Sequence, residues 1–541
     1  MPLRKRATIE WENFNIPVSY VIGEKGRFLS DSRNVFSIQD RLENRYGIER
    51  YNSTAMASTA LSGSFFKLAD GTRQRIVKSG TQLYTVPATG AHTSIKSGLT
   101  SANKHRAINF NRGSRARHII AVDTDGLFSW DGTTFTQLGQ AVPGAPTVAV
   151  SGAGNTLPAA SYQVACTFES SISGFETNIG TSSSVIALTL GQQLDVTAIP
   201  ATAANALIDK VNVYVRNFTT ASDWIFWVQN SLGTTTATID SQLLSTRIPP
   251  ENNGTPPASG KYLCEFDSAL VVAGISTDKG AVYISEKNIP DAFNNDGLTN
   301  TRLFPQGFGD ITGIASALFN DSEIFPYLVM FKMSSTHIYS VSGGLSVLSK
   351  EIGCVSHDTI VVEGGRIRFL SADGWREIEN GRFLMIKTRD GSRQITTLGF
   401  GKIDDIFRSP GYAYEVNQAN LNTAFSVNYS KVGHYLTFLP EAGTTTIRKA
   451  YNFEREVGGF RPFDFAHNLL CAFVGEDDSG LETVYLGTDT GYFFTYSVSN
   501  DRVDQDVDGA DVVFDAYAIL AFMAGDDMDA TYNWGRLVVD A

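Results

Sequence analysis

Two stretches of the sequence align without gaps, Asp125-Gly126-Leu127-Phe128-Ser129-Trp130-Asp131-Gly132-Thr133-Thr134-Phe135 and Asp373-Gly374-Trp375-Arg376-Glu377-Ile378-Glu379-Asn380-Gly381-Arg382-Phe383. Each consists of a turn, a short strand, a tight Asp-Gly or Asn-Gly turn and the start of another strand, because these dipeptides tolerate the positive φ of two-residue hairpins. Weaker copies lie at residues 80–86, 337–341 and 490–496. The chain therefore repeats a strand-hairpin unit.

The spacing of the copies predicts the size of the repeated unit. Tyr84 and Trp130 are about 45 residues apart, and Tyr339 and Trp375 are 36 apart, near the length of a four-stranded propeller blade. A blade cannot bury both of its faces alone, so several must pack around a channel. The 49 Gly, 34 Phe and 20 Tyr residues suit strands and tight turns. We therefore expect an all-β fold, a β-propeller of about six to eight blades.

Proline-rich runs mark an insertion in this repeat. Residues 143–146 open it and residues 248–257 close it, and such runs cannot join the interior of a sheet. Between them apolar residues alternate over 162–168, 211–215 and 224–228. This pattern predicts a β-sandwich of immunoglobulin or fibronectin type. We expect it in a loop between blade strands, where a domain with close ends leaves the ring undisturbed.

The predicted organisation has five segments. They are an N-terminal arm with the first propeller strands, the first part of the propeller, the inserted sandwich, the remainder of the propeller and an acidic C-terminal segment, at residues 1–55, 56–141, 142–258, 259–500 and 501–541.

Charge is distributed unevenly along the chain, whose formal net charge is −12. Residues 1–130 hold 19 Lys and Arg against 10 Asp and Glu, which gives +9, and residues 476–541 hold 2 against 15, which gives −13. The asymmetry fits head-to-tail contacts between subunits. It fits equally well a propeller whose blades simply differ in surface charge.

The sequence contains no motif for catalysis or for a bound metal or cofactor. HExxH, paired CxxC and Gly-x-Ser-x-Gly patterns are absent, and the seven histidines are scattered singly, which predicts turn or surface positions. Residues 371–375 only faintly resemble the Asp-box turn of sialidases. We therefore predict no catalytic, metal or cofactor residue and no enzyme, with a glycosidase as a minor alternative.

Residues 504–509, Asp-Gln-Asp-Val-Asp-Gly, resemble the opening of a calcium loop, because carboxylates at alternate positions can wrap a hard cation. The late bidentate Glu is missing, and Asp515 stands in its place. A solvated acidic loop is the preferred interpretation.

Several features bear on the compartment. Widely spaced cysteines indicate small buried apolar residues in a reducing environment rather than a disulfide scaffold; they are Cys166, Cys264, Cys354 and Cys471. Basic residues 4–6 are not followed by the apolar run that a signal peptide needs. No stretch approaches the roughly 20 apolar residues of a membrane span. We expect a soluble protein made in the cytoplasm.

The order of these features resembles the tail nozzle, tail hub or stabilisation β-propeller proteins of short-tailed bacteriophages. The resemblance rests on residues 31–35 and 44–48 of the opening, on the strand at 282–285, and above all on Ile352-Gly353-Cys354-Val355-Ser356-His357, followed by Phe369-Leu370-Ser371-Ala372-Asp373-Gly374-Trp375. It covers most of residues 20–541 through short strand motifs. The opening is slightly altered at Tyr46, which precedes Gly47.

The resemblance implies a structural subunit of the virion tail, assembled in the host cytoplasm. Such a subunit forms a homohexameric ring below the portal and adaptor, extends the DNA exit channel and anchors fibres or spikes. Genomic DNA would pass through the lumen without specific binding, which suits a net negative charge, with the acidic C-terminal region as the proposed lining. The alternative is a receptor- or glycan-binding tail component.

A basic arm is the one predicted contact site. Arg4, Lys5 and Arg6 would be disordered in isolation, so we expect them to contact a partner such as the adaptor. Neither membrane insertion nor a cofactor is expected.

Overall fold

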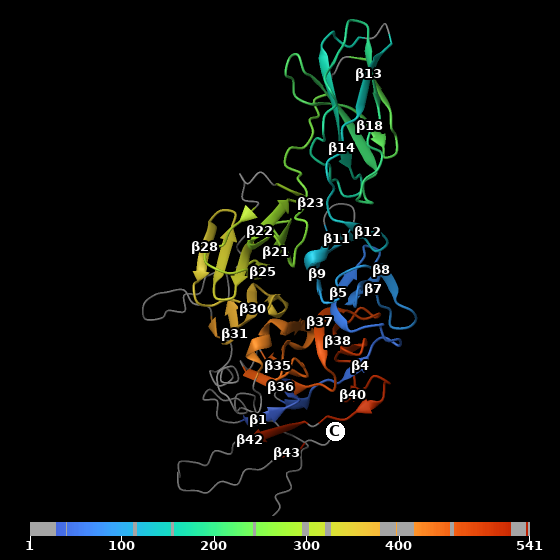
Figure 1. Cartoon of the computed structure of the whole chain (residues 1–541). Helices are drawn as coiled ribbons and strands as arrows, with labels where there is room; N and C mark the ends of the chain where they lie inside the picture. The colour runs from blue at the N-terminus through green and yellow to red at the C-terminus, as the bar shows by residue number, and fades with distance from the viewer. Residues whose placement is uncertain are drawn as a thin grey trace, which may run out of the picture.

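The computed structural model shows a chain built almost entirely of short antiparallel strands (Figure 1). The described residues are 29–38, 41–111, 116–152, 156–241, 245–294, 302–319, 326–378, 396–397, 416–454, 459–514, 516–520 and 537–538.

Seven sheets follow one another around a ring within these ranges, so the fold is a β-propeller and the blade number lies within the predicted range. Blades 1 to 3 are β5–β8 (Ala60–Lys67, Arg73–Ser79, Gln82–Thr85, Thr93–Lys96), β9–β12 (His105–Phe110, Arg117–Val122, Gly126–Trp130, Phe135–Gln137) and β20–β23 (Tyr262–Phe266, Ala269–Ile275, Asp278–Glu286, Ile289–Phe293). In blade 3, β24 (Arg302–Leu303) also pairs with β22.

Blades 4 to 6 continue the ring, and blade 7 combines the two ends of the chain. They are β25–β28 (Ile311–Ala317, Tyr327–Lys332, Thr336–Ser340, Gly344–Ser349), β29–β32 (Val361–Glu363, Arg366–Ser371, Gly374–Ile378, Thr396–Thr397), β33–β36 (Phe425–Tyr429, His434–Leu439, Lys449–Glu454, Gly459–Asp464), and β37–β39 (Leu469–Glu476, Glu482–Thr488, Phe493–Tyr496) with β4 (Ile48–Arg50).

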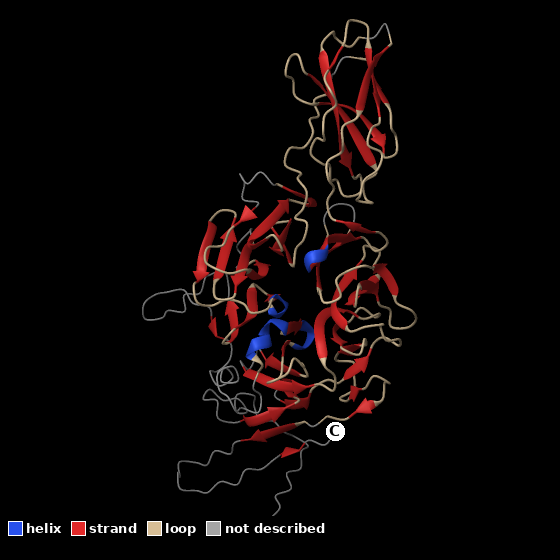
Figure 2. Cartoon of the chain, viewed as in Figure 1, coloured by secondary structure: helices blue, strands red, loops and turns tan. Residues whose placement is uncertain are grey.

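The innermost strands form a closed circle. Each first strand contacts the first strand of the next blade, in the order β5, β9, β20, β25, β29, β33, β37 and back to β5. Helix is scarce among the described residues (Figure 2). It is limited to four short 3-10 helices, η1 (Asp123–Asp125), η2 (His357–Thr359), η3 (Gln418–Thr423) and η4 (Ser430–Val432). In the described part of the chain, no helix has the length and apolarity to cross a bilayer.

The repeat found in the sequence corresponds to the third strand of a blade. Its copies coincide with β7, β11, β27, β31 and β39. Gly126 and Gly374, which open β11 and β31, have the same φ of +130°, a value that favours glycine. The predicted turn and strand are therefore confirmed in five blades, although residues 379–383 of the second copy, with the Asn380-Gly381 turn, lie outside the described residues. The strands β22 and β35 of blades 3 and 6 carry no recognisable copy.

The ring is closed by a strand from the beginning of the chain. In blade 7, Ile48 and Arg50 pair with Tyr496 and Phe494 of β39. Ile48 is fully buried in the apolar core between blades 6 and 7. The N-terminal segment therefore supplies the outermost strand of the last blade rather than strands of the first one.

The acidic C-terminal segment packs on this closure. Asp504 of β40 (Asp504–Gln505), which pairs with β41 (Asp511–Val512), is 1% exposed. Its carboxylate accepts two hydrogen bonds from Arg45, at 2.8 and 2.7 Å, and one from the Ile48 amide at 3.1 Å. Both earlier interpretations, a solvated loop and a calcium loop, are therefore wrong for Asp504, because its charge is matched by an arginine far away in the sequence.

Further strands from both ends form a layer beside blade 6. β1 (Leu29–Arg33) pairs with β42 (Tyr517–Leu520), which also pairs with β43 (Leu537–Val538). β2 (Val35–Ile38) and β3 (Arg41–Asn44) form a hairpin, and both β1 and β2 contact β36. We call β1–β3 with β40–β43 the terminal layer.

The insertion is a two-sheet sandwich that stands out from the ring (Figure 1). One sheet is β13 (Thr147–Ser151), β16 (Gln193–Thr197) and β19 (Ala237–Ile239); the other is β15 (Ile186–Ala187), β14 (Ser161–Glu169), β17 (Lys210–Asn217) and β18 (Ile225–Ser231). It connects blade 2 to blade 3, not two strands of one blade as expected. Its membership of the immunoglobulin or fibronectin class stays a prediction.

Candidate functional site: the central cavity and the blade seams

A cavity of about 360 Å³ lies between the inner strands of the ring. Its walls come from β5, β9, β33 and β37 of four blades and from the η2 turn that precedes blade 5. The polar side chains that line it are Ser62, Ser64, Lys104, His105, Arg106, Asn109, His118, His357 and Asp358.

An ion pair joins blade 2 to the η2 turn at this cavity. Arg106 donates from Nε and Nη2 to the two carboxylate oxygens of Asp358, at 2.7 and 3.0 Å, and the Lys104 ammonium lies 3.5 Å from the same carboxylate. Burial alone would raise the pKa of Asp358, but the charges of Arg106 and Lys104 outweigh it and hold this pKa well below its usual range. Asp358 is therefore ionised at neutral pH.

Three imidazoles around the cavity are neutral. Burial lowers the pKa of His105, His118 and His357 to about 3. The His357 ring packs on Tyr262, with ring centroids 4.7 Å apart, while His105 and His118 are hydrogen-bonded to serines of β5. Groups whose pKa lies this far from neutrality exchange few protons at pH 7.

The histidines correct a sequence-based expectation. His105, His118, His337 and His434 are all at most 2% exposed, although scattered single histidines predict turn or surface positions. The hydrogen-bonding partners of His105, His118 and His434 lie on other strands, as when Tyr496 contacts His434 from 62 residues away. No spacing rule reveals such partners.

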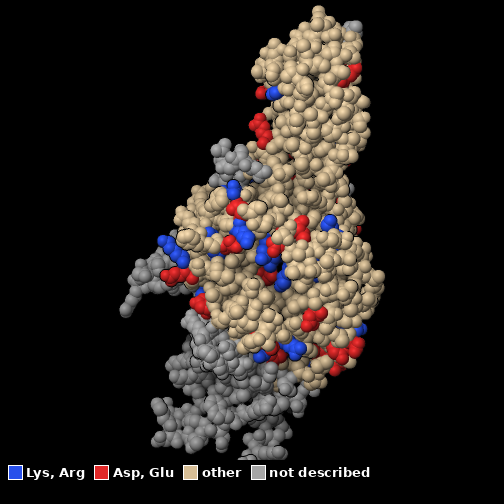
Figure 3. All heavy atoms as spheres, in the orientation of Figure 1, with Lys and Arg blue, Asp and Glu red and all other residues tan. Residues whose placement is uncertain are grey.

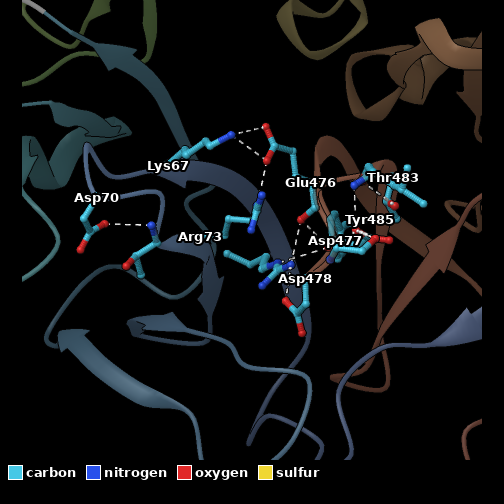
Figure 4. A network of polar contacts seen from close by, with 12 residues as sticks. Lys67, Asp70, Arg73, Glu476, Asp477, Asp478, Thr483 and Tyr485 are labelled. Carbon is cyan, nitrogen blue, oxygen red and sulfur yellow. Dashed lines mark hydrogen bonds and ion pairs between the residues drawn. The ribbon is translucent and has the colours of Figure 1, made fainter.

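A second polar network joins blade 7 to blade 1 (Figure 4). Glu476 binds Lys67 Nζ at 2.8 Å and Arg73 Nε at 2.7 Å. Arg75 reaches the Asp478 carboxylate at 3.0 Å and the Tyr485 hydroxyl at 3.2 Å. The contacts tie β5 and β6 to the β37–β38 hairpin, so they strengthen the seam where the ring closes.

The base of the sandwich is fixed to blades 2 and 3. Arg117 of β10 donates to Asp291 of β23 at 2.7 Å, with side chains 5% and 1% exposed. Asp291 also accepts the Gly139 amide at 3.0 Å. Asn205 of the sandwich donates its amide N–H to Gln140 Oε1 at 2.8 Å and its side-chain amide to the Gly139 carbonyl at 3.1 Å.

The predicted contact residues and cysteines have different outcomes. Arg4, Lys5 and Arg6 lie outside the described residues. The four cysteines are unpaired; Cys166, Cys354 and Cys471 are buried as predicted, and Cys264 is partly exposed. Burial raises the pKa of each of the three buried thiols to about 12, so they are unreactive at neutral pH.

The polar contacts described above can hold a fixed charge pair at the central cavity of the propeller and can lock neighbouring blades together. Within the described ranges, no group of three or more His, Cys, Asp or Glu side chains is placed to hold a metal ion. Sequence reasoning missed both Arg106–Asp358 and Arg45–Asp504, because their members are 252 and 459 residues apart and carry no local motif.

Comparison with known proteins identifies no family for this chain. No family model and no curated protein matches the sequence. Similar solved structures include BBS1N in complex with ARL6DN (TM-score 0.30, 8% identity, 85% of this chain and 99% of that chain), Kluyveromyces lactis Hsv2 (0.25, 8%, 80% and 98%) and YCF48 bound to D1 peptide (0.28, 9%, 86% and 99%). At these scores the fold assignment depends on the sheet topology of the chain itself.

Proposed function

We propose that the chain is a structural subunit of the tail of a short-tailed bacteriophage, of the nozzle or hub class. It would form a ring with further copies of itself, extend the DNA exit channel below the portal and adaptor, and anchor fibres or spikes. The virion tail is then its location, and the adaptor and the fibre or spike proteins are its partners.

The observation that carries this proposal is the placement of two added modules on one closed ring. The sandwich and the terminal layer project from opposite edges of the propeller (Figure 1). The connection to the sandwich is held at Gly139, which donates to Asp291 of blade 3 and accepts from Asn205 of the sandwich. The terminal layer is anchored by the buried Arg45–Asp504 pair. A subunit in a cyclic ring contacts its two neighbours through different surfaces, and rigid modules at opposite edges supply such surfaces.

The segments that resemble tail proteins form part of the propeller framework. The Cys354 amide donates to the Lys332 carbonyl at 3.0 Å, and the Val355 amide donates to the Leu370 carbonyl at 2.9 Å, so residues 352–357 join blade 4 to blade 5. Trp375 Nε1 donates to Thr437 Oγ1 of blade 6 at 2.9 Å. The resemblance therefore involves residues that set the geometry between blades.

Surface charge differs between the modules. On the face drawn in Figure 3, charged side chains gather over the propeller and are few on the sandwich. Residues 142–258 hold 3 Lys and Arg and 7 Asp and Glu. A surface with few charges has a low desolvation cost on contact with another protein, which suits an outward module that binds a neighbouring subunit or a fibre.

One feature of the sandwich favours the alternative function, a receptor- or glycan-binding tail component. At the end of β17, the Arg216 guanidinium lies 4.7 Å from the ring centroid of Trp224 and 5.6 Å from that of Phe218. Phe218 is 48% exposed. An exposed aromatic group beside a cation is typical of carbohydrate- and protein-binding surfaces.

The solution mass of the purified full chain, measured by light scattering with negative-stain top views, tests the proposal. Closed rings of about six copies with an open centre are expected for a cyclic tail ring. A trimer would contradict it and favour the receptor-binding alternative. A chain without residues 1–8 tests the basic arm separately: it should keep the isolated fold but fail to join the particle, whereas unchanged incorporation would refute that contact.

A further inference from the structure

A continuous chain of hydrogen bonds runs along the wall of the central cavity, from blade 1 to blade 2. Ser62 Oγ lies 2.7 Å from His105 Nδ1, and Ser64 Oγ lies 3.0 Å from His105 Nε2. The same Ser64 oxygen lies 2.8 Å from His118 Nε2. His118 Nδ1 lies 2.7 Å from Asn109 Oδ1. Two serines of β5 thus alternate with two histidines of β9 and β10.

The position of every proton follows from the last member of the chain. Asn109 donates its amide to the Phe65 carbonyl at 3.2 Å, so the Oδ1 atom that faces His118 accepts. His118 must therefore carry its proton on Nδ1 and accept at Nε2 from the Ser64 hydroxyl.

The same reasoning fixes the second imidazole. The Ser64 hydroxyl is already donating, so its oxygen accepts from His105 Nε2–H, and His105 Nδ1 accepts from Ser62. The Ser62 oxygen in turn accepts the His105 backbone N–H at 2.9 Å. Both rings are neutral, and they are held in opposite tautomers.

An added proton has no place in this chain. A proton added to His105 Nδ1 or His118 Nε2 would point at the serine hydroxyl that already donates to that nitrogen. The hydroxyl proton would then have to turn away and lose its acceptor. The charged groups that act electrostatically on His105 are Lys78, Arg106 and Asp358. The first two repel a charged imidazole, and Asp358 is already bound to Arg106. His118 stacks on Phe66, with ring centroids 5.2 Å apart, which offers no compensating charge.

We propose that Ser62, His105, Ser64, His118 and Asn109 form an acid-sensitive latch between blades 1 and 2. The latch holds β5 against β9 and β10 while both imidazoles are neutral, and it opens when either takes a proton. Asn109 is exposed and lines the cavity, so protons reach the chain from that end. This inference does not depend on the tail-ring proposal.

The direction of the pH effect follows from the two pKa values. Both histidines have a folded-state pKa lowered from 6.5 to about 3. Their contribution to stability is therefore fully present above about pH 6.5 and is lost as the pH falls toward 3.

Nitrogen-15 NMR of the full chain with labelled histidine tests the latch without any substitution. At pH 7 and at pH 5, the account expects neutral rings with the proton on Nδ1 of His118 and on Nε2 of His105. Assignment comes from the spectra of His105→Gln and His118→Gln. A proton on Nε2 of His118 and on Nδ1 of His105 would overturn the proposal, and so would a charged ring at pH 5 in the folded chain.

Hydrogen exchange locates the opening in the fold. On acidification from pH 7 to pH 4, backbone protection corrected for the intrinsic rate should fall first in β5, β9 and β10. The matched control is the pair β14 and β17 of the sandwich, which contains no histidine and should keep its protection longer. Simultaneous loss in both places would contradict a local latch. In urea unfolding at pH 5, the double variant His105→Gln/His118→Gln should take up about two fewer protons than the wild type, and an unchanged uptake would also refute it.

Discussion

Two ion pairs join the beginning of the chain to its end, and they differ mainly in burial. Arg45–Asp504 spans 459 residues and has side chains 0% and 2% exposed. Lys67–Glu476 spans 409 residues and has side chains 45% and 29% exposed. Because burial decides what the loss of one partner costs, we expect the buried pair to contribute far more to stability than the exposed one, although both join the two ends of the chain.

Geometry accounts for the difference. The Arg45 guanidinium contacts both oxygens of Asp504 and lies between the rings of Phe465 and Phe514, 4.5 and 3.8 Å from their centroids. Water cannot replace either partner there, so the loss of one leaves the other charge buried. Lys67 remains in contact with solvent, where water and salt screen its charge.

The largest expected effect follows from Asp504→Asn. It leaves the Arg45 charge buried without its counter-ion, so the free energy of unfolding should fall by about 3–5 kcal/mol. Urea unfolding at pH 7 measures it. Because an amide cannot accept at both of its atoms, one Arg45 contact is lost even if the other persists.

The double variant Arg45→Met/Asp504→Leu is the matched control for this change. It removes both charges, so the chain should recover part of the loss seen with Asp504→Asn. If Asp504→Asn lowers the free energy of unfolding by less than about 1 kcal/mol, the buried Arg45–Asp504 pair contributes no more than an exposed pair. Burial would then not explain any difference between the two ion pairs.

An intermediate effect is expected for Asp358→Asn at the central cavity. The Arg106 and Asp358 side chains are 15% and 20% exposed, so the loss should be roughly 1–3 kcal/mol. Because the pKa of Asp358 is lowered from 3.8 in the folded chain, its contribution is present above about pH 4 and is lost as the pH falls further. Wild type and variant should therefore converge in stability at low pH. A difference as large at pH 2 as at pH 7 would refute the electrostatic origin.

The smallest effect is expected for Glu476→Gln on the exposed seam (Figure 4). Its contacts with Lys67 and Arg73 are charge-assisted but open to solvent, so the loss should stay below about 1 kcal/mol. Thermal unfolding at low and high salt measures it, and the difference from wild type should shrink at high salt. A salt-independent loss of several kcal/mol would show that exposure does not separate the two pairs.

The sequence predicts what depends on neighbours in the chain. The Gly126 and Gly374 turns recur because the third strands of blades 2 and 5 open with the same backbone conformation, and the repeat that they belong to predicted the propeller. The proline-rich runs at residues 143–146 and 248–257 likewise marked the two ends of the sandwich, because proline acts locally and cannot join the interior of a sheet.

Long-range partners could not be predicted in this way. The closing strand β4 is three residues long and has no pattern that separates it from a loop. Asp504 stands among other acidic residues, and nothing local distinguishes it as the one that meets Arg45. The alternation of His105 and His118 with Ser62 and Ser64 appears only when two blades are packed together.

The central claim is that the sandwich is held rigidly on a closed ring. Spin labels at Thr234 of the sandwich and Thr89 of blade 1, both exposed, give the distance distribution between the two bodies by pulsed electron resonance. The account predicts one narrow distribution, which broadens in Asn205→Ala as the contacts of this side chain with Gly139 and with Thr136 of blade 2 are lost. A broad distribution in the wild-type chain would contradict a rigid subunit.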